Sequence, residues 1–336
     1  GLRANKRSIE AAGLVQAGAG ENLAEARAPA YLETAGGRVA LISVASTFAD
    51  FGRAGSQRKD FRGRPGLSPI RYETIYTVPG GHFDRLREIA EELDVGNVED
   101  DEIRLRGEIY RRGSSFAETT RPHEGDLAEI VEQVRDAKRQ ANWVIVSSHS
   151  HESADSRDVP ADFIREFARA TIEAGADVWV GHGPHVLRGV EIHRGRVILY
   201  SLGDFIFQNE TVELQPADNY QRYGLGNEHL PSEFYDTREN RSGGGFPANP
   251  LIWEGLVAVT DFRGGELAEV RLHPVTLGHG LPRPQRGRPL LAKGDLGRKI
   301  LGDVQRLSEA MGTRVVIEDG VGVIRVQAVS TNDERP

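Results

Sequence analysis

Four of the ten histidines stand in two short motifs, and each motif directly follows an apolar run. His149 and His151 lie in SSHSHE, and His182 and His185 lie in GHGPH. Imidazole nitrogens bind divalent zinc, iron, manganese or nickel, and a short turn can direct two of them at one ion. A single histidine after a strand is more often an ordinary polar loop residue. Two such pairs at equivalent places indicate a metal site.

The segments before the motifs predict the elements that position them. The apolar runs 143–148 (WVIVSS) and 177–180 (DVWV) predict buried strands that end where the motifs begin. Helical spacing of apolar residues precedes each run, over 127–137 and 163–172. Such alternation predicts a mostly parallel sheet with helices on both faces. Ligands bind at the carboxyl ends of parallel strands, so neighbouring strands would bring the two pairs to one crevice.

The remaining elements follow from the same patterns. After residue 186 the alternation of helices and strands gives way to antiparallel strand pairs. We expect helices at 1–13, 82–93 and 295–310, a strand at 39–45, and antiparallel pairs within 190–201, 256–272 and 315–326. The predicted fold is therefore a layered α/β fold with an antiparallel C-terminal flank.

Composition narrows the classes of protein. The 336 residues carry a formal net charge of −8 and include no Cys. The absence of Cys excludes a disulfide scaffold, a Cys-ligated zinc site, an iron–sulfur protein and thiol catalysis. The acidic balance argues against a nucleic-acid-binding face. No apolar run approaches the roughly 18 residues of a membrane span. No signal peptide is recognisable, but this absence carries no information where upstream residues are missing, so the compartment is left open, with the cytoplasm favoured.

Two long stretches lack a period and are candidates for substrate binding. Residues 46–72 are rich in arginine, and we expect Arg53, Arg58 and Arg62 to contact a polyanionic substrate. Residues 208–255 suggest a lid that brings Tyr220 and Arg238 to the substrate. The alternatives are a solvated surface loop for the first and an ordinary packed insertion for the second.

Two further motifs complete a family resemblance. The sequence GHGPHV (181–186), followed by YSLGDFIF (200–207), is similar to the signature of the CapA-like family of poly-γ-glutamate capsule-biosynthesis proteins. That family belongs to the calcineurin-like metallophosphoesterase superfamily. The segments VIVSSHSHE (144–152) and GLVQAGAGENLAEARAPAYLE (13–33) also resemble family segments.

The resemblance covers most of residues 1–207 and implies a division of the chain. We expect a CapA-like, metallophosphoesterase-type core at 1–207, a substrate or lid insertion at 208–255, and a β-rich C-terminal part of the same domain at 256–330. The family's upstream ligands, an early Asp, an Asn and an Asn-Asn-His motif, would lie before Gly1. We therefore expect the chain to lack the first strands of its core.

By position, the resemblance also implies roles for individual residues. His149, His182 and His185 correspond to metal ligands, for which manganese, iron or zinc is expected. His151 and Glu152 flank the first ligand and are candidates for proton transfer. Asp204 stands where the family usually has Asn, and it is a further acid or base candidate.

Three functions remain open at this point. The leading one is a metal-dependent hydrolase that cleaves a poly-γ-glutamate, peptide-like or phosphoester substrate with a metal-activated water. A second is a metal-assisted peptide epimerase that removes a Cα proton at the same centre. The third is a non-catalytic accessory subunit of capsule polymer synthesis.

Overall fold

The computed structural model describes residues 1–240 and 246–326, and it divides the chain into two compact units, Gly1–Val180 and Gly181–Pro336. The class is α/β, with several sheets and both α-helices and strands in each unit, as predicted. The parts of the predicted insertion at 241–245 and of the predicted C-terminal part at 327–330 lie outside the described residues.

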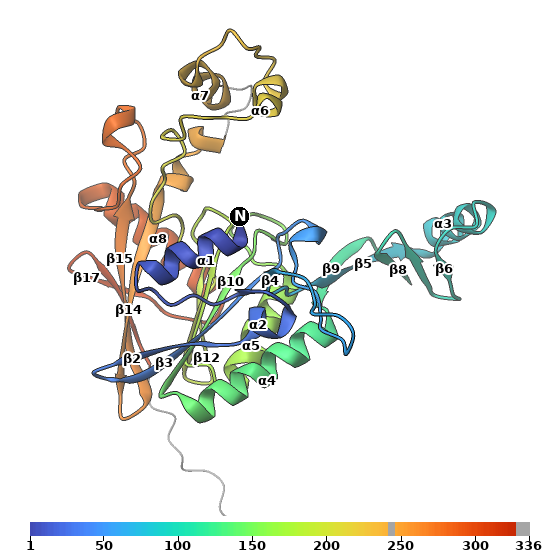
Figure 1. Ribbon diagram of the computed structural model, residues 1–336, viewed down its shortest axis with the longest axis horizontal. Helices are drawn as coiled ribbons and strands as arrows, with labels where there is room; N and C mark the ends of the chain where they lie inside the picture. The colour runs from blue at the N-terminus through green and yellow to red at the C-terminus, as the bar shows by residue number, and fades with distance from the viewer. Residues whose placement is uncertain (241–245, 327–336) are drawn as a thin grey trace, which may run out of the picture. The chain divides into compact units, whose positions relative to one another are not determined.

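The first unit contains the predicted strand at 39–45. β3 (Gly37–Ala45) pairs in parallel with β10 (Trp143–His149) and antiparallel with β2 (Ala30–Thr34) (Figure 1). Every second residue of β3 and β10 is buried, as expected for strands whose side chains alternate between two faces. The register pairs Ala45 with His149. Both strands therefore end at the same edge of the sheet.

The helices predicted beside these strands are confirmed. α4 (Glu124–Gln140) packs on β3 and β10 through a stripe that includes Ile130, Val134 and Ala137. α5 (Asp162–Glu173) buries Phe163 and Phe167 and packs against α4. The N-terminal residues form α1 (Leu2–Ala11), and the short α2 (Leu23–Arg27) lies beside a two-stranded sheet of β1 (Ala19–Gly20) and β4 (Gly66–Leu67).

A five-stranded sheet in this unit was not predicted. Its five strands carry α3 (Gly80–Glu92), which Figure 1 shows at the far end of the sheet from α4. A small core of its own includes Val78, Phe83 and Ile103. In spatial order the strands are β6 (Asn97–Val98), β7 (Glu102–Leu105), β8 (Glu108–Gly113), β5 (Tyr72–Pro79) and β9 (Ala117–Pro122).

A buried ion cluster ties α2 to α4 and to the start of β5. The side chains of Arg27 and Asp126 are 4% and 3% exposed, and Arg27 Nη2 donates to Asp126 Oδ1 at 2.5 Å. Arg71 donates to the same carboxylate from Nε at 2.7 Å and from Nη2 at 2.9 Å. Burial opposes ionisation of Asp126, but the hydrogen bonds from Arg71 and the two positive charges hold its pKa below the usual range.

The second unit is mostly antiparallel, which confirms the predicted flank. The strand β11 (Val178–His182) runs across the boundary between the units. α8 (Gly294–Glu309) packs against β12 and β15. The strands are the hairpin β12 (Val190–His193) and β13 (Arg196–Leu199), and a sheet of β14 (Glu254–Arg263), β15 (Glu266–Thr276), β18 (Val321–Arg325) and β17 (Val316–Glu318), with β16 (Leu290–Leu291) beside β15.

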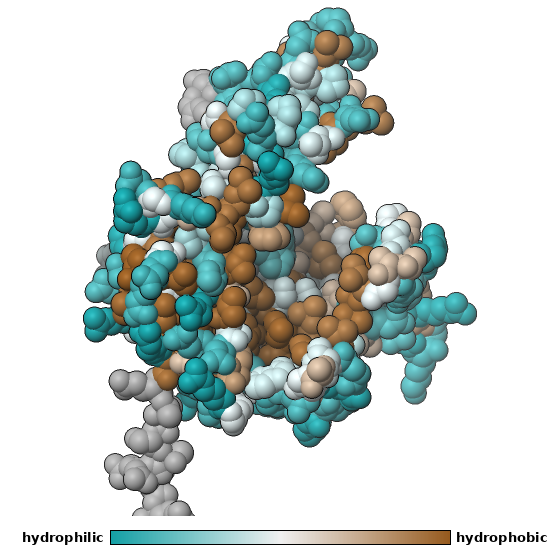
Figure 2. Space-filling model, turned by 90° about the vertical axis from the view of Figure 1, so that its left-hand side faces the viewer, coloured by the Kyte–Doolittle hydropathy of each residue, from teal (hydrophilic) through white to brown (hydrophobic). Residues whose placement is uncertain are grey.

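A helical insertion precedes β14. It contains α6 (Ala217–Arg222), α7 (Pro231–Glu239) and the 3₁₀ turns η2 (Phe246–Ala248) and η3 (Pro250–Trp253). Figure 2 shows it at the top as a lobe with a mainly hydrophilic surface and scattered apolar side chains. Its buried aromatic residues within the helices are Phe234 and Tyr235. The end of the insertion also joins a buried apolar cluster of Ile252, Trp253, Val275 and Leu277, against which Phe246 packs.

Across residues 1–240 and 246–326, no helix is both long and apolar enough to cross a bilayer.

Candidate metal centre

The first histidine pair lies at the carboxyl end of β10. His149 is the last residue of the strand, and the next turn returns His151 so that the two Nε2 atoms are 3.1 Å apart. Two nitrogens bound at about 2.0–2.1 Å to one Zn²⁺ are separated by about 2.9–3.4 Å at coordination angles of about 90–110°. The pair therefore has the spacing of two ligands of one ion. This geometry adds His151, expected only in proton transfer, to the possible ligands.

Glu152 is held at the same edge by the residues that follow β3. Ser46 Oγ donates to Glu152 Oε2 at 2.6 Å, and Thr47 Oγ1 donates to Oε1 at 2.9 Å. The Thr47 oxygen also accepts the backbone N–H of His151 at 3.0 Å. Hydroxyl donors on both oxygens fix the orientation of the carboxylate. The role of Glu152 in proton transfer stays a prediction.

The basic loop starts and ends at this edge. It leaves β3 at Ser46 and returns where Ser68 O accepts the backbone N–H of Ala45 at 3.0 Å. In the part of the chain that the structure describes, no ion pair or side-chain hydrogen bond engages Arg53 or Arg62. Arg58 instead pairs with Asp60 on the open surface, at 3.0 Å. Of the three predicted arginines, Arg53 and Arg62 keep their guanidinium groups available.

The second histidine pair belongs to the other unit. His182 is the exposed last residue of β11, and His185 is half-buried in the following turn. His185 Nδ1 lies 2.9 Å and 3.1 Å from the two carboxylate oxygens of Asp204. An ionised carboxylate can only accept hydrogen bonds, so Nδ1 is the donor in this contact and Nε2 is the ring nitrogen that does not face Asp204. Asp204 therefore orients His185 in the way that carboxylates orient metal-bound histidines.

The hairpin register explains the contact between His185 and Asp204. Val190 pairs with Leu199, and the bridge between Leu187 and Leu202 continues that register toward the open end. Two further residues along each segment, the same register places residue 185 opposite residue 204. The predicted hairpin therefore already contained the signal for this pair.

His185 also adopts an unusual backbone conformation. Its φ is +59°, in the left-handed region that costs a non-glycine residue about 1–3 kcal/mol. Strain of this kind persists where the surrounding structure determines it, and it concentrates at functional sites.

The two pairs, His149 with His151 and His185 with Asp204, supply donor atoms that suit a divalent metal. The donor set is imidazole and carboxylate, the set that suits zinc, iron and manganese. Within the ranges 1–240 and 246–326, no three or more His, Cys, Asp or Glu side chains form a group that could hold a metal ion. The metal itself stays a prediction.

The two lid candidates lie in the helical insertion. The Tyr220 ring packs against Phe234, with ring centroids 5.3 Å apart. Arg238 donates from Nη1 to Asn209 Oδ1 at 2.6 Å, and its guanidinium lies 5.7 Å from the centre of the Phe246 ring. Both side chains thus contribute to packing within the insertion. Their expected contact with substrate stays a prediction.

Known proteins resemble the chain over different lengths. A protein from Sinorhizobium fredii named Uncharacterized protein y4sH is 38% identical over 336 residues, covering 97% of this chain and 73% of that protein. The PGA biosynthesis protein CapA of Bacillus subtilis is 46% identical over 78 residues, 23% of this chain and 20% of CapA. The Probable polyglutamine synthesis accessory protein MT0602 of Mycobacterium tuberculosis is 29% identical over 196 residues, 58% of this chain and 41% of that protein.

The family model described as Bacterial capsule synthesis protein PGA_cap matches residues 1–209. This span includes both histidine motifs and Asp204. The chain therefore belongs to the bacterial capsule synthesis protein (PGA_cap) family, whose fold is of the metallophosphoesterase type.

Proposed function

We propose that the protein is a metal-dependent hydrolase in which His149, His182 and His185 supply imidazole ligands to divalent manganese, iron or zinc. The observation that carries the proposal is the contact between His185 and Asp204, in which a carboxylate orients a candidate ligand. In the first unit, His149 Nε2 lies 3.1 Å from Nε2 of His151, which is a further possible ligand. When bound, the metal supplies Lewis acidity that polarises a substrate oxygen and acidifies water.

The protein residues have separate tasks in this proposal. Glu152, held by two hydroxyl groups, accepts the proton that the attacking water loses. Asp204 keeps His185 in the tautomer whose Nε2 can bind a cation.

The proposed substrate is an anionic, peptide-like polymer such as poly-γ-glutamate. Arg53 and Arg62 project from a loop whose two ends are attached at the edge that carries His149 and Glu152. Guanidinium groups bind carboxylates by paired hydrogen bonds. The printed name of one relative, PGA biosynthesis protein CapA, supports a polymer of this kind, whereas the name polyglutamine synthesis accessory protein refers to a polymer with uncharged side chains.

Removing both arginines is expected to weaken substrate binding more than turnover. Each exposed charge contact contributes up to about 1 kcal/mol, so Arg53→Ala/Arg62→Ala should raise KM for a γ-linked glutamate oligomer by up to about 30-fold at low salt, with kcat changed less than about threefold. The measurement is KM at two ionic strengths. The effect should shrink as salt rises, because salt screens exposed charges.

Arg85→Ala is the matched control for this pair, because Arg85 lies on α3 in the separate five-stranded part of the unit. It should leave KM unchanged. An equal rise in KM for Arg85→Ala, or an unchanged KM for the double variant, would contradict the role of the loop.

The reaction is identified by a screen with manganese, iron and zinc. γ-Glutamyl oligomers and phosphodiesters are the substrates, and the products are followed in deuterated water. Hydrolysis releases new amine and carboxylate ends, or an alcohol and a phosphomonoester. Solvent deuterium at a substrate Cα without bond cleavage would identify the epimerase alternative and exclude hydrolysis.

A second candidate is a non-catalytic accessory role, which the printed name of the Mycobacterium tuberculosis relative favours. It predicts that polymer binding survives chelation of divalent metals and that no bond is cleaved. The hydrolase predicts that chelation abolishes turnover. Activity and polymer binding, each measured with and without chelator, separate the two.

A further inference from the structure

An aromatic cluster in the second unit leads directly to His185. The Phe246 ring meets the His185 ring edge-on, with centroids 4.8 Å apart and an interplanar angle of 80°. Phe207 contacts both Phe246, at 5.7 Å between centroids, and Trp253, at 4.8 Å. Trp253 is 1% exposed, and its Nε1 donates to Pro247 O at 2.7 Å. The backbone beside Phe246 is thereby fixed to a buried residue.

The ring of Phe246 is also held by the insertion. Arg238 places its guanidinium 5.7 Å from the Phe246 centroid and hydrogen-bonds Asn209. Asp204 holds Nδ1 of His185, while Phe246 packs on the ring itself. Two independent contacts therefore restrict the two torsions of the His185 side chain.

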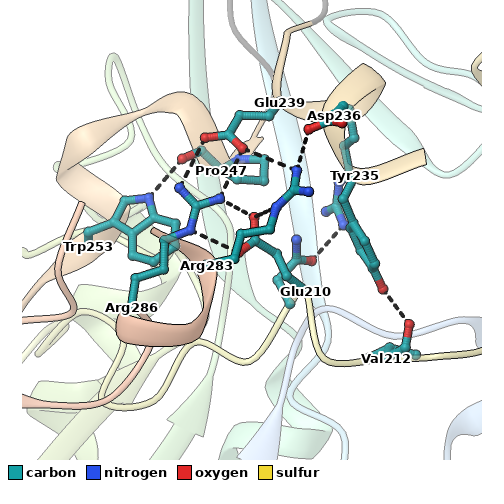
Figure 3. Close-up of polar contacts among 11 residues, drawn as sticks. Glu210, Val212, Tyr235, Asp236, Glu239, Pro247, Trp253, Arg283 and Arg286 are labelled. Atoms are coloured by element: carbon teal, nitrogen blue, oxygen red, sulfur yellow. Dashed lines mark hydrogen bonds and ion pairs between the residues drawn. The ribbon is translucent and has the colours of Figure 1, made fainter. Parts of the chain in front are cut away.

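Arg286 joins the separate segments of this assembly (Figure 3). Its side chain is 7% exposed, and its Nε donates to Glu210 Oε2 at 2.8 Å near the start of the insertion. Its two terminal nitrogens donate to Glu239 at the end of α7, at 3.2 Å and 3.0 Å. Its guanidinium also lies 4.9 Å from the ring centroid of Trp253. The buried Arg286 side chain thus connects three parts of the insertion: its beginning at Glu210, α7 at Glu239 and its end at Trp253.

The anchoring is strong for physical reasons. Hydrogen bonding to Glu210 raises the pKa of Arg286 above its usual range, so the guanidinium stays charged at all relevant pH values. Charge-assisted, bidentate hydrogen bonds are stronger than neutral ones, especially when shielded from water. The adjacent backbone is equally constrained, because Gly287 O accepts the N–H of Phe207 at 2.8 Å. A side chain on Gly287 would meet Phe207 O at 2.2 Å.

We propose that Phe246 is a positioning residue that fixes the His185 ring, and that Arg286 acts on His185 through Phe246 by locking the insertion. This inference depends on the proposed metal-dependent function only in its prediction of metal affinity. The orientation of the His185 ring can be measured in the metal-free protein. Arg286 and Phe246 accordingly act in series: Arg286 holds the insertion, and Phe246 contacts the candidate ligand His185.

The test uses the whole chain in two states. In the metal-free protein, NMR of the imidazole C–H groups of His185 measures ring-current shift and ring motion. Phe246→Ala should remove the ring-current shift and increase ring motion, and Arg286→Gln should do so in part. Phe246→Tyr keeps the aromatic edge and should retain the wild-type signals.

With cobalt(II) as the metal probe, Phe246→Ala and Arg286→Gln should each weaken binding about 10-fold, the lower end of the effect of losing an orienting partner. The double variant should bind no more than about twofold more weakly than Phe246→Ala alone, since contacts on one path are not additive. Arg263→Gln is the matched control. Arg263 lies on β14, pairs with Asp261 and is 76% exposed, so its replacement should leave His185 signals and cobalt affinity unchanged.

The possible outcomes are distinct. Unchanged His185 signals in Phe246→Ala, or fully additive effects of Phe246→Ala and Arg286→Gln on those signals, would overturn the inference. A wild-type protein that binds no cobalt would overturn the proposed metal function, and the metal-free NMR data would still decide whether Phe246 and Arg286 position His185.

Discussion

Replacing Glu152 by Gln is expected to lower kcat by about 10²–10⁴-fold, the usual contribution of a positioned general base. The amide has the shape of the carboxylate and can still accept a hydrogen bond from Ser46 or Thr47, so the local fold should persist. It has no basic oxygen for the proton of the attacking water. Metal content should stay at the wild-type level, because the proposed ligands are the histidines. Steady-state kinetics and metal analysis of the same preparation measure both quantities.

Asp155→Asn is the control for this substitution. Asp155 lies three residues further along the same loop and is exposed. It removes one negative charge near the site without removing the held carboxylate, and it should change kcat less than about threefold. Equal losses in the two variants would assign the effect to overall charge and contradict the role of Glu152.

Asp126→Asn is expected to destabilise the first unit by about 2–3 kcal/mol, because it removes the buried anion that Arg27 and Arg71 share. Arg27 is 4% exposed and keeps an ion pair with Glu129, whose side chain is 62% exposed. Native-state hydrogen exchange of α4 and β10 amides reports the opening of this unit alone. The control Asp60→Asn removes the partner of the exposed Arg58 and should cost less than about 1 kcal/mol. Similar losses in both variants would contradict the account of the buried cluster.

The same carboxylate gives a pH dependence whose direction is fixed. The pKa of Asp126 is lowered in the folded protein, so the unfolded chain takes up this proton first as the pH falls. Its contribution is complete above the unfolded value of about 3.9 and is lost as pH falls through the lower folded value. The difference between wild type and Asp126→Asn should be constant from pH 7 to about pH 5 and shrink below about pH 4.

Elements with one apolar face could be predicted from the sequence. Ile130, Val134 and Ala137 recur at helical spacing because they cover β3 and β10, and the buried alternation of β10 follows from the same core. In α4 and β10 the spacing of apolar residues matches the residues that are buried, so this spacing is sufficient to predict the two elements.

The five-stranded sheet could not be predicted in this way. Its strands carry charged pairs across the sheet, such as Glu73 with Arg104 and Arg121, and Glu102 with Arg111. These side chains interrupt the apolar alternation that marks a half-buried strand.

The candidate ligands could be named from the sequence, but most of the residues that hold them in place could not. The histidine motifs and Asp204 stand out in the sequence, and the hairpin register implies the contact between Asp204 and His185. Ser46 and Thr47 lie about a hundred residues before Glu152 and meet it only because β3 pairs with β10. Contacts of that separation depend on the tertiary fold, which local patterns do not contain.

The central claim is that the histidines of the two motifs bind a divalent metal. The most direct measurement is metal content per chain after equilibrium dialysis against manganese, iron or zinc, for the wild type and for His182→Ala and His185→Ala, with His82→Ala on α3 as the control. The account predicts that the wild type and the control retain at least about one ion per chain and that both motif variants lose it. Equal metal content in all four proteins would contradict it.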